Sequence, residues 1–258
     1  MSSRNKSQGI IRVSHREIVG PGDVIGEGGI SFEKYPYAYR FRNKIISTVL
    51  GVAEVRSDNT LKITPLEGVY IPSEGDIVIG VVEEVNPTYA YLDIRAPYKG
   101  ILPATEILGR PLNPSKDVLT DYVSIGDVFL ARVERFDLLR DPLLSIRKEK
   151  GLGRIVEGSL IEIIPTRVPR VIGRRSSMLE ILTKETGCDV VIANNGRILI
   201  RRCATQEHEE ILIKALKIIE MQPYVKGLTN KIREYIVVEK VRRGLIGGYS
   251  QGGSQTDK

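Results

Sequence analysis

The chain has 258 residues, more than one domain usually holds, so we expect two or three packed units. Lysine and arginine number 38 against 32 aspartate and glutamate, and the net charge of +6 favours an anionic partner. No segment is apolar enough to predict a membrane span or a signal peptide, and the two cysteines are too few for a disulfide framework and lack zinc-site spacing. We therefore expect a cytoplasmic protein that has no membrane contact, no bound metal and no cofactor.

Residues 1–70 predict an N-terminal domain built from β-strands. Its segments IIRV, GPGDVIGEGG, NKIISTVLGVAEV and NTLKITPL are rich in β-branched residues and are divided by glycine and proline. Gly26-Glu27-Gly28-Gly29 matches no nucleotide fingerprint and predicts a mobile β-turn. A turn-rich segment at 67–76 ends this unit.

Residues 71–152 predict a small barrel of five short strands. The strands are expected in DIVIGVVEEV, TYAYLDI, KGILPATEI, GDVFLARVERF and PLLSIRK. Within TYAYLDI the small and aliphatic side chains alternate with Tyr89 and Tyr91, so the two rings are expected on the exposed face. The polar segment 109–127 predicts a long loop with little regular structure.

Residues 153–246 change character and predict an α+β domain. Strand GSLIEIIP, turn RVIGRRSS and helix MLEILTKETG are followed by two strands around Asn194-Asn195-Gly196 and by the helix ATQEHEEILIKALKIIEM. The order is β-α-β-β-α, with room for a short helix at the glycine turn, and GLTNKIREYIVVEKVRRG predicts a further helix. Residues 247–258 are rich in glycine and serine and predict a disordered tail. The fold class is therefore mainly β plus α+β.

The turn of this third unit carries a candidate site for a phosphodiester backbone. Gly173 lets a ligand approach the main chain, Arg174 and Arg175 supply charge, and the next helix presents unpaired N–H groups. Arg170 adds a further cation, and the segment 167–175 contains no acidic residue.

The third unit resembles the KH family of RNA-binding domains. The resemblance rests on Val171-Ile172-Gly173, on Leu179 and Leu182 of the following helix, and on Thr186-Gly187. It implies that the turn clamps a short stretch of single-stranded RNA, as the GxxG loop of that family does. Ser176 stands where the family has its second glycine. The alternative is a KH-shaped scaffold that only packs against its neighbours.

The barrel resembles the OB-fold module repeated in ribosomal protein S-one, over about residues 74–150. In that family aromatic rings stack on bases while basic residues meet the backbone. The resemblance carries these roles to three rings and three cations, namely Tyr89, Tyr91, Tyr98, Lys99, Arg132 and Arg147. Alternatively, each tyrosine caps the barrel end or packs on a neighbouring domain.

The order of the three units resembles one family, the RNA-binding cap subunits of the exosome, in its archaeal form. The motifs Val19-Gly20-Pro21-Gly22-Asp23 and Pro72-Ser73-Glu74-Gly75-Asp76 support this resemblance. It implies three copies on a hexameric ring of RNase PH-like subunits, alone or mixed with another cap protein. It also implies that the N-terminal domain contacts the ring, that single-stranded RNA enters through a central opening, and that the ring performs 3'-to-5' cleavage.

The sequence predicts no catalytic residues. His15 and His208 are far apart, and no HExxH, GxSxG or P-loop spacing occurs. The carboxylates Glu83-Glu84, Asp137 and Asp141 are explained as ordinary charges at strand and loop ends. The leading hypothesis is a non-catalytic RNA-binding cap. The alternatives are an exoribonuclease and, ahead of it, a ribosome-associated or translation protein that uses the same RNA-binding modules.

Overall fold

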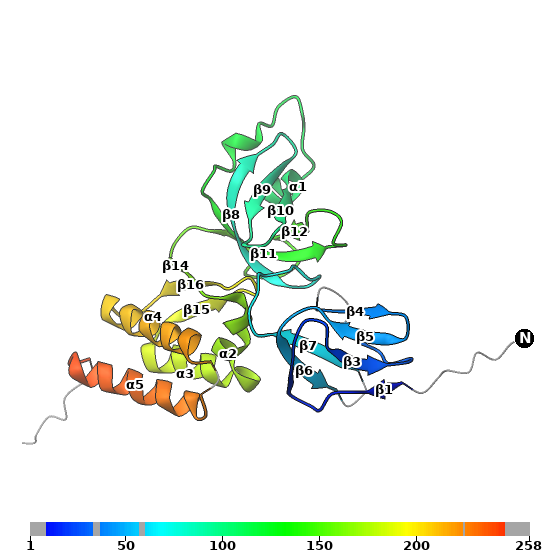
Figure 1. The fold of residues 1–258 in the computed structure, drawn as a ribbon. Helices are drawn as coiled ribbons and strands as arrows, with labels where there is room; N and C mark the ends of the chain where they lie inside the picture. The colour runs from blue at the N-terminus through cyan, green and yellow to red at the C-terminus, as the bar shows by residue number, and fades with distance from the viewer. Residues whose placement is uncertain (1–8, 33–36, 57–59, 224, 246–258) are drawn as a thin grey trace, which may run out of the picture.

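The computed structural model describes residues 9–32, 37–56, 60–223 and 225–245, which form three packed groups of elements (Figure 1). Two β-sheets of the N-terminal part lie beside a unit of helices and a small sheet, and a barrel stands above both. The predicted mixture of a β domain, a barrel and an α+β unit is confirmed. The predicted tail at 247–258 lies outside the described residues. No described helix is long and apolar enough to cross a membrane.

The N-terminal part consists of two sheets that enclose one core. One has the order β1-β3-β5-β4 and the other β2-β6-β7. Their strands are β1 (Ile10–Ile11), β2 (Glu17–Val19), β3 (Val24–Glu27), β4 (Ala38–Phe41), β5 (Lys44–Ser47), β6 (Gly51–Val55) and β7 (Leu61–Pro65). Both sheets contribute to the core, with Ile25 and Ile45 from the first and Ala53 and Ile63 from the second.

One predicted segment of the N-terminal part is divided between two sheets, and one predicted turn is wrong. The segment NKIISTVLGVAEV forms two strands in different sheets, because the chain turns after Ser47 and re-enters at Gly51. A Cβ atom at Gly51 would lie 2.7 Å from Ile63 Cγ2, so the glycine allows β6 to pass close to β7. Gly26 and Glu27 were predicted in a mobile turn, but they belong to β3 and pair with β1 and β5.

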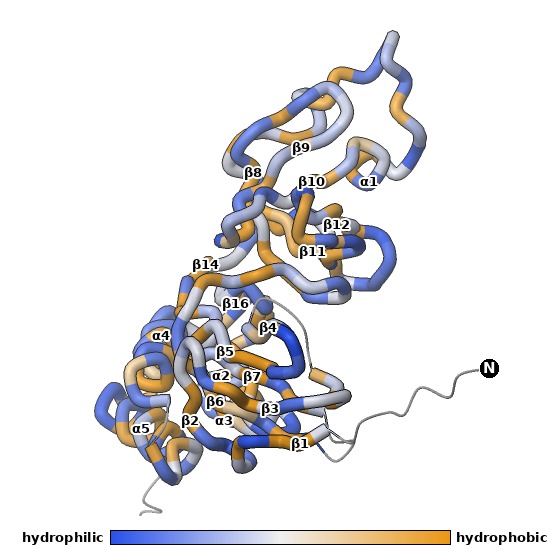
Figure 2. Tube along the Cα trace, turned by 45° about the vertical axis from the view of Figure 1, so that its right-hand side comes forward, coloured by the Kyte–Doolittle hydropathy of each residue, from blue (hydrophilic) through white to orange (hydrophobic). Residues whose placement is uncertain are grey.

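The barrel has the five strands that its sequence predicts. They are β8 (Ile77–Val85), β9 (Tyr89–Asp93), β10 (Lys99–Pro103), β11 (Val128–Arg135) and β12 (Leu143–Ser145), in the order β12-β10-β9-β8-β11, and pairing of β12 with β11 closes the sheet. Figure 2 shows hydrophobic and hydrophilic residues mixed along the barrel. Ala90, Leu92 and Ile94 are fully buried, so the predicted alternation in TYAYLDI is confirmed.

Short elements extend the barrel beyond its five strands. The predicted strand KGILPATEI ends at Pro103 and continues as the helix α1 (Ala104–Leu108). The loop that follows contains only one short helical turn, η1 (Leu119–Asp121). A sixth strand, β13 (Gly153–Ile155), pairs with β11 and therefore extends the barrel sheet past residue 152.

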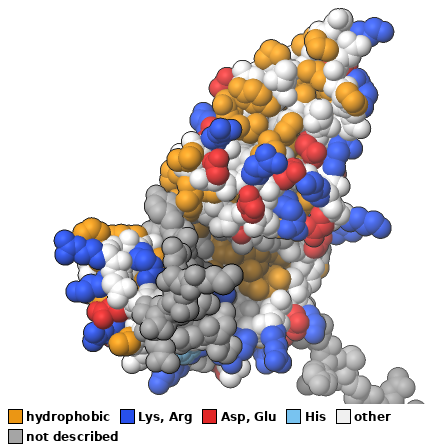
Figure 3. Space-filling view, turned by 90° about the vertical axis from the view of Figure 1, so that its right-hand side faces the viewer, with side chains coloured by type: hydrophobic (Ala, Val, Ile, Leu, Met, Phe, Trp, Pro, Cys, Tyr) orange, Lys and Arg blue, Asp and Glu red, His pale blue; other side chains and the backbone are white. Residues whose placement is uncertain are grey.

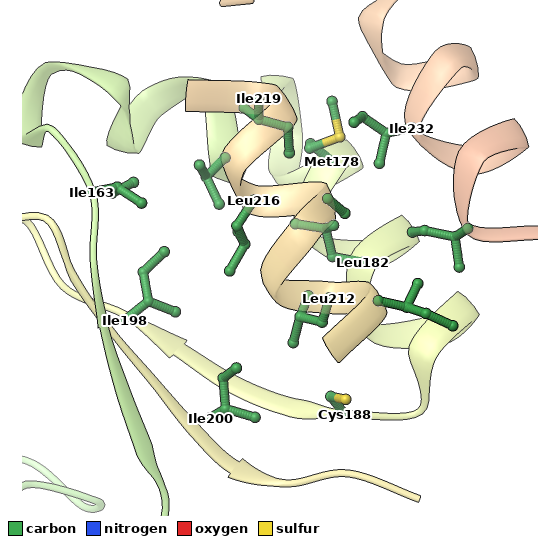
Figure 4. Close-up of a cluster of buried hydrophobic side chains, with 14 of the residues drawn as sticks. Ile163, Met178, Leu182, Cys188, Ile198, Ile200, Leu212, Leu216, Ile219 and Ile232 are labelled. Carbon is green, nitrogen blue, oxygen red and sulfur yellow. The ribbon is translucent and has the colours of Figure 1, made fainter. Parts of the chain in front are cut away.

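The third unit packs helices on a three-stranded sheet of order β14-β16-β15. Its elements are β14 (Ser159–Glu162), η2 (Pro165–Arg167), α2 (Val168–Ile172), η3 (Arg174–Ser176), α3 (Ser177–Thr186), β15 (Asp189–Ile192), β16 (Arg197–Arg202), α4 (Gln206–Met221) and α5 (Leu228–Arg242). Ile198 and Ile200 of the sheet face Leu212 and Leu216 of α4 in the core (Figure 4). A disulfide joins Cys188 to Cys203, a pairing that the sequence analysis did not assign.

The hairpin between β15 and β16 fastens this unit to the barrel. Asn195 is fully buried, and its Nδ2 donates to the carbonyl oxygens of Ile79 at 2.8 Å and Ile94 at 2.9 Å. Beside it, the backbone N–H of Asn194 donates to Ile77 O at 2.8 Å, and the Ile77 N–H donates to Asn194 Oδ1 at 3.0 Å. The hairpin thus supplies partners for backbone groups of the barrel that would otherwise be buried without them.

Arg197 forms the second part of this junction. Only 4% of the residue is exposed, yet its guanidinium donates to the carbonyl oxygens of Ile79 at 3.1 Å and Asp93 at 2.6 Å. The carboxylates of Asp93 and Glu162 pair with the same guanidinium, one from each unit. A buried cation is tolerated when it is paired and hydrogen-bonded in this way.

We expect Asn195→Ala to lower the free energy of unfolding by several kcal/mol. The substitution removes the Asn195 donor from the carbonyl oxygen of Ile94, leaves the carbonyl oxygen of Ile79 with Arg197 as its side-chain donor, and removes the acceptor of the Ile79 N–H. Each buried group left unsatisfied costs about 1–3 kcal/mol. Asn195→Asp should be at least as damaging, because a carboxylate cannot donate to Ile79 and Ile94. Urea denaturation checks both. Asn230→Ala, at an exposed position of α5, is the control, and an equal midpoint for Asn195→Ala and Asn230→Ala would contradict the role of the junction.

Candidate nucleic-acid interface

The arginine corner, residues 170–175, is an exposed turn between α2 and α3. Arg170 is exposed in the last turn of α2, and Arg174 and Arg175 follow Gly173 in the short turn η3. Within the part of the chain that the structure describes, no acidic side chain pairs with Arg174 or Arg175. Their charges are therefore available to an anionic ligand.

The backbone of this corner keeps a tight turn without a second glycine. Gly173 has φ +75°, and a Cβ atom there would lie 2.7 Å from the backbone nitrogen of Met178. Arg175 and Ser176 also have positive φ, at 50° and 62°, in the left-handed region that glycine occupies at little cost. Ser176 thus adopts a conformation that a glycine would adopt readily, at a cost on the order of 1 kcal/mol in strain.

Two substitutions test this conformation in opposite directions. Gly173→Ala should lower the free energy of unfolding by about 1–3 kcal/mol, because the new methyl group meets Met178 and the backbone is left-handed. Ser176→Gly should leave it unchanged or raise it by up to about 1 kcal/mol, since relief of strain outweighs the added freedom of the unfolded chain. Thermal denaturation measures both changes, and a large loss for Ser176→Gly would contradict the strained turn.

The aromatic face of the barrel is formed by Tyr89 and Tyr91. They follow the same side of β9, half-buried, with ring centroids 5.0 Å apart in an edge-to-face arrangement. Lys99 lies over the Tyr91 ring, its Nζ 5.9 Å from the centroid. Hydrogen bonding with Tyr89 raises the pKa of Tyr91, which therefore remains a neutral phenol at physiological pH. The face offers two flat neutral rings for stacking.

Acidic groups surround this aromatic face. Glu83 pairs with Lys99 at 2.9 Å and raises the pKa of Lys99, and the register of β8 and β9 places Glu84 opposite Tyr91. Asp141 accepts a hydrogen bond from the Lys99 backbone N–H at 3.1 Å. Acidic and basic side chains are also interspersed on the barrel face seen in Figure 3. The aromatic face therefore suits a base better than a phosphate.

Tyr98 lies apart from the other two predicted rings. Its ring packs edge-to-face on Phe136 with centroids 4.8 Å apart, and its hydroxyl donates to Leu138 O at 3.2 Å. Tyr98 therefore packs on the barrel itself, and its contact with RNA stays a prediction.

The two remaining barrel cations are held by the barrel itself. Arg132 donates to Gly75 O at 2.8 Å and pairs with Glu149. Arg147 donates through Nε to Glu106 O at 2.6 Å and through Nη2 to Ile107 O at 3.3 Å, so it caps the end of α1. The charge of Arg132 is thus paired with a carboxylate, whereas Arg147 is held by neutral carbonyl groups.

The predicted site residues therefore fall into separate places. Gly173 and its three arginines form one exposed corner, while Tyr89, Tyr91 and Lys99 form the aromatic face of another unit. Sequence reasoning missed the junction at Asn195 and Arg197, which fixes these units together. Its signal was present as an asparagine pair in a hairpin, but a turn is the ordinary explanation for that pattern.

A closed OB-type barrel followed by a KH-type unit with an exposed arginine turn defines a modular RNA-binding class of protein. Residues 16–67 match the family model described as the exosome RNA binding protein RRP4 N-terminal domain. The chain is 48% identical to exosome complex component Rrp4 of Sulfurisphaera tokodaii, over 86% of this chain and 88% of the relative. The protein of the same name from Saccharolobus solfataricus is 42% identical, over 97% of this chain and 99% of the relative. The chain belongs to the Rrp4 family of exosome components.

A solved structure supports this assignment. It is described as an exosome complex RNA-binding protein, is 42% identical in sequence, and superposes with a TM-score of 0.64. The match covers 68% of this chain and 99% of the other.

Proposed function

We propose that this chain is a non-catalytic, RNA-binding cap subunit of a cytoplasmic exosome. It captures single-stranded RNA and guides it to a phosphorolytic ring of RNase PH-like subunits, which degrades or processes the RNA from its 3' end. Three copies sit on the hexameric ring, alone or mixed with another cap protein. The observation that carries the proposal is the similarity to Rrp4 of Saccharolobus solfataricus, which extends over 97% of the chain.

The geometry supports a division of RNA contacts between two units. The arginine corner supplies positive charge at an exposed turn, which suits the phosphate backbone. The aromatic face supplies Tyr89 and Tyr91, which suit stacking on bases with little dependence on their identity. This combination fits a protein that must accept many RNA sequences.

The direct test measures binding of labelled single-stranded RNA as a function of salt. We expect the full chain, alone or assembled with exosome ring subunits, to bind with an affinity that falls as salt rises. RNA should remain intact with the isolated chain and should be shortened only when the ring and phosphate are present. Absence of binding in the assembled complex would contradict the proposal, and cleavage by the isolated chain would favour an exoribonuclease.

Charge reversal at Arg174 and Arg175 together should weaken RNA binding about tenfold or more at low salt. Each lost phosphate contact lowers the slope of log affinity against log salt by about 0.7 for a single strand. The loss should be similar for different RNA sequences, because phosphate contacts carry little sequence information. The control reverses the exposed Lys214 and Lys217 of α4 instead. Equal affinities for the two double variants would remove the arginine corner from the RNA site.

Replacement of Tyr89 and Tyr91 by alanine should weaken binding with little change in the salt slope. Each stacked base contributes about 1–3 kcal/mol, and stacking involves no release of counterions. Tyr39→Ala, at an exposed position of β4, is the matched aromatic control. Thermal denaturation of the same variants separates the outcomes, since a lowered melting temperature without loss of affinity would show that the rings serve packing alone.

A further inference from the structure

A cleft of about 620 Å³ separates the arginine corner from the N-terminal part of the chain. One wall comes from α2 and the turn after it, with Pro169, Arg170, Gly173 and Arg174. The other wall is the outer face of the β2-β6-β7 sheet, where Arg16 stands at the edge. The cleft thus brings a cation of the N-terminal part opposite the turn that resembles an RNA clamp.

The wall formed by the sheet carries a mainly apolar row of side chains across three strands. Ile18 of β2 pairs with Val52 of β6, which pairs in turn with Thr64 of β7, so the three side chains lie on one face. The residues paired beside them, Ala53 and Ile63, are buried in the core on the opposite face. Ile18 remains 65% exposed, which leaves apolar surface for riboses and bases to cover.

The two walls are held in place by hydrogen bonds at the base of the cleft. Thr166 Oγ1 and Arg167 Nη1 both donate to the carbonyl oxygen of Leu66, at 3.2 Å and 3.0 Å. Leu66 directly follows β7, while Thr166 and Arg167 directly precede α2. The cleft is therefore formed before a ligand arrives, and binding need not order its walls.

The charge of the lining selects an anionic occupant. Arginines number four among the lining residues, at positions 16, 167, 170 and 174, and Glu54 is the only acid among them. Arg16 is exposed, and no acidic side chain of the described residues pairs with it. Guanidinium groups on opposite walls suit phosphates that follow one another along a strand.

We propose that this cleft binds the sugar-phosphate backbone of single-stranded RNA, with Arg16 and Arg174 contacting phosphates from opposite walls. The proposal rests on the proposed function and extends it, because Arg16 lies outside both RNA-binding modules. The arginine corner then grips RNA against the N-terminal sheet rather than at an open surface. Glu54 opposes binding from the same wall as Arg16.

The test compares single substitutions in the full chain under the same RNA-binding assay. Arg16→Gln should weaken binding about three- to tenfold at low salt and lower the salt slope by about 0.7. Glu54→Gln should strengthen RNA binding and make the affinity depend more steeply on salt, because the substitution removes a negative charge that repels phosphates. Arg42→Gln is the matched control, because Arg42 is also exposed, also has positive φ and belongs to the same unit outside the cleft.

The outcomes separate this inference from the proposed function. If the parent chain binds RNA and Arg16→Gln binds as tightly as Arg42→Gln, the cleft proposal is overturned while the proposed function stands. If Arg16→Gln binds RNA normally but assembles poorly on the ring, the cleft serves an acidic protein segment and the proposal is again overturned. If the assembled parent complex binds no RNA, the proposed function fails first. Photo-crosslinking with 4-thiouridine RNA should mark peptides containing Arg16 and Arg174, and crosslinks confined to the barrel would overturn the proposal.

Discussion

The buried side chains of Asn195 and Arg197 fix how the parts of this protein are arranged. Both reach from a hairpin of the KH unit into the barrel, where they supply donors to the backbone oxygens of Ile79, Ile94 and Asp93. Ile79 and Leu130 of the barrel also share a buried apolar cluster with Ala193 and Leu199 of the KH unit. Buried amides and guanidinium groups accept few geometries, because each donor left without an acceptor costs free energy. The junction therefore specifies one relative orientation of the two units instead of a flexible link.

That fixed orientation determines what the two candidate RNA surfaces can do together. The aromatic face and the arginine corner belong to different units, so a polynucleotide that contacts both must follow a path set by the junction. A second fixed link, from Thr166 and Arg167 to Leu66, sets the corner against the N-terminal sheet. Each surface is thus presented on a rigid frame, which reduces the ordering cost of binding an unstructured strand.

The sequence predicted the features that depend on local residue patterns. It did not predict the features that depend on contacts between residues far apart in the sequence. Period-two alternation placed Ala90 and Leu92 in the barrel core, and helical spacing together with Gly187 located α3. No local pattern could show that NKIISTVLGVAEV divides between two sheets, because the division depends on packing of Gly51 against Ile63. The same limit applies to contacts of the predicted site: no local pattern could show that carbonyl groups of α1 engage Arg147, which the sequence predicts as a ligand for RNA. Whether the site residues contact RNA stays a prediction.

Ion pairs within the chain compensate its positive charges in some regions and leave them uncompensated in others. In the barrel, Lys99 and Arg132 each face a glutamate, so their positive fields are largely compensated before any ligand arrives. Arg174 at the arginine corner and Arg16 on the opposite wall of the cleft form no ion pair with a carboxylate of the described residues. Because counterion release depends on uncompensated cations, the salt-dependent part of RNA affinity should originate at the cleft, and the barrel should contribute salt-independent stacking.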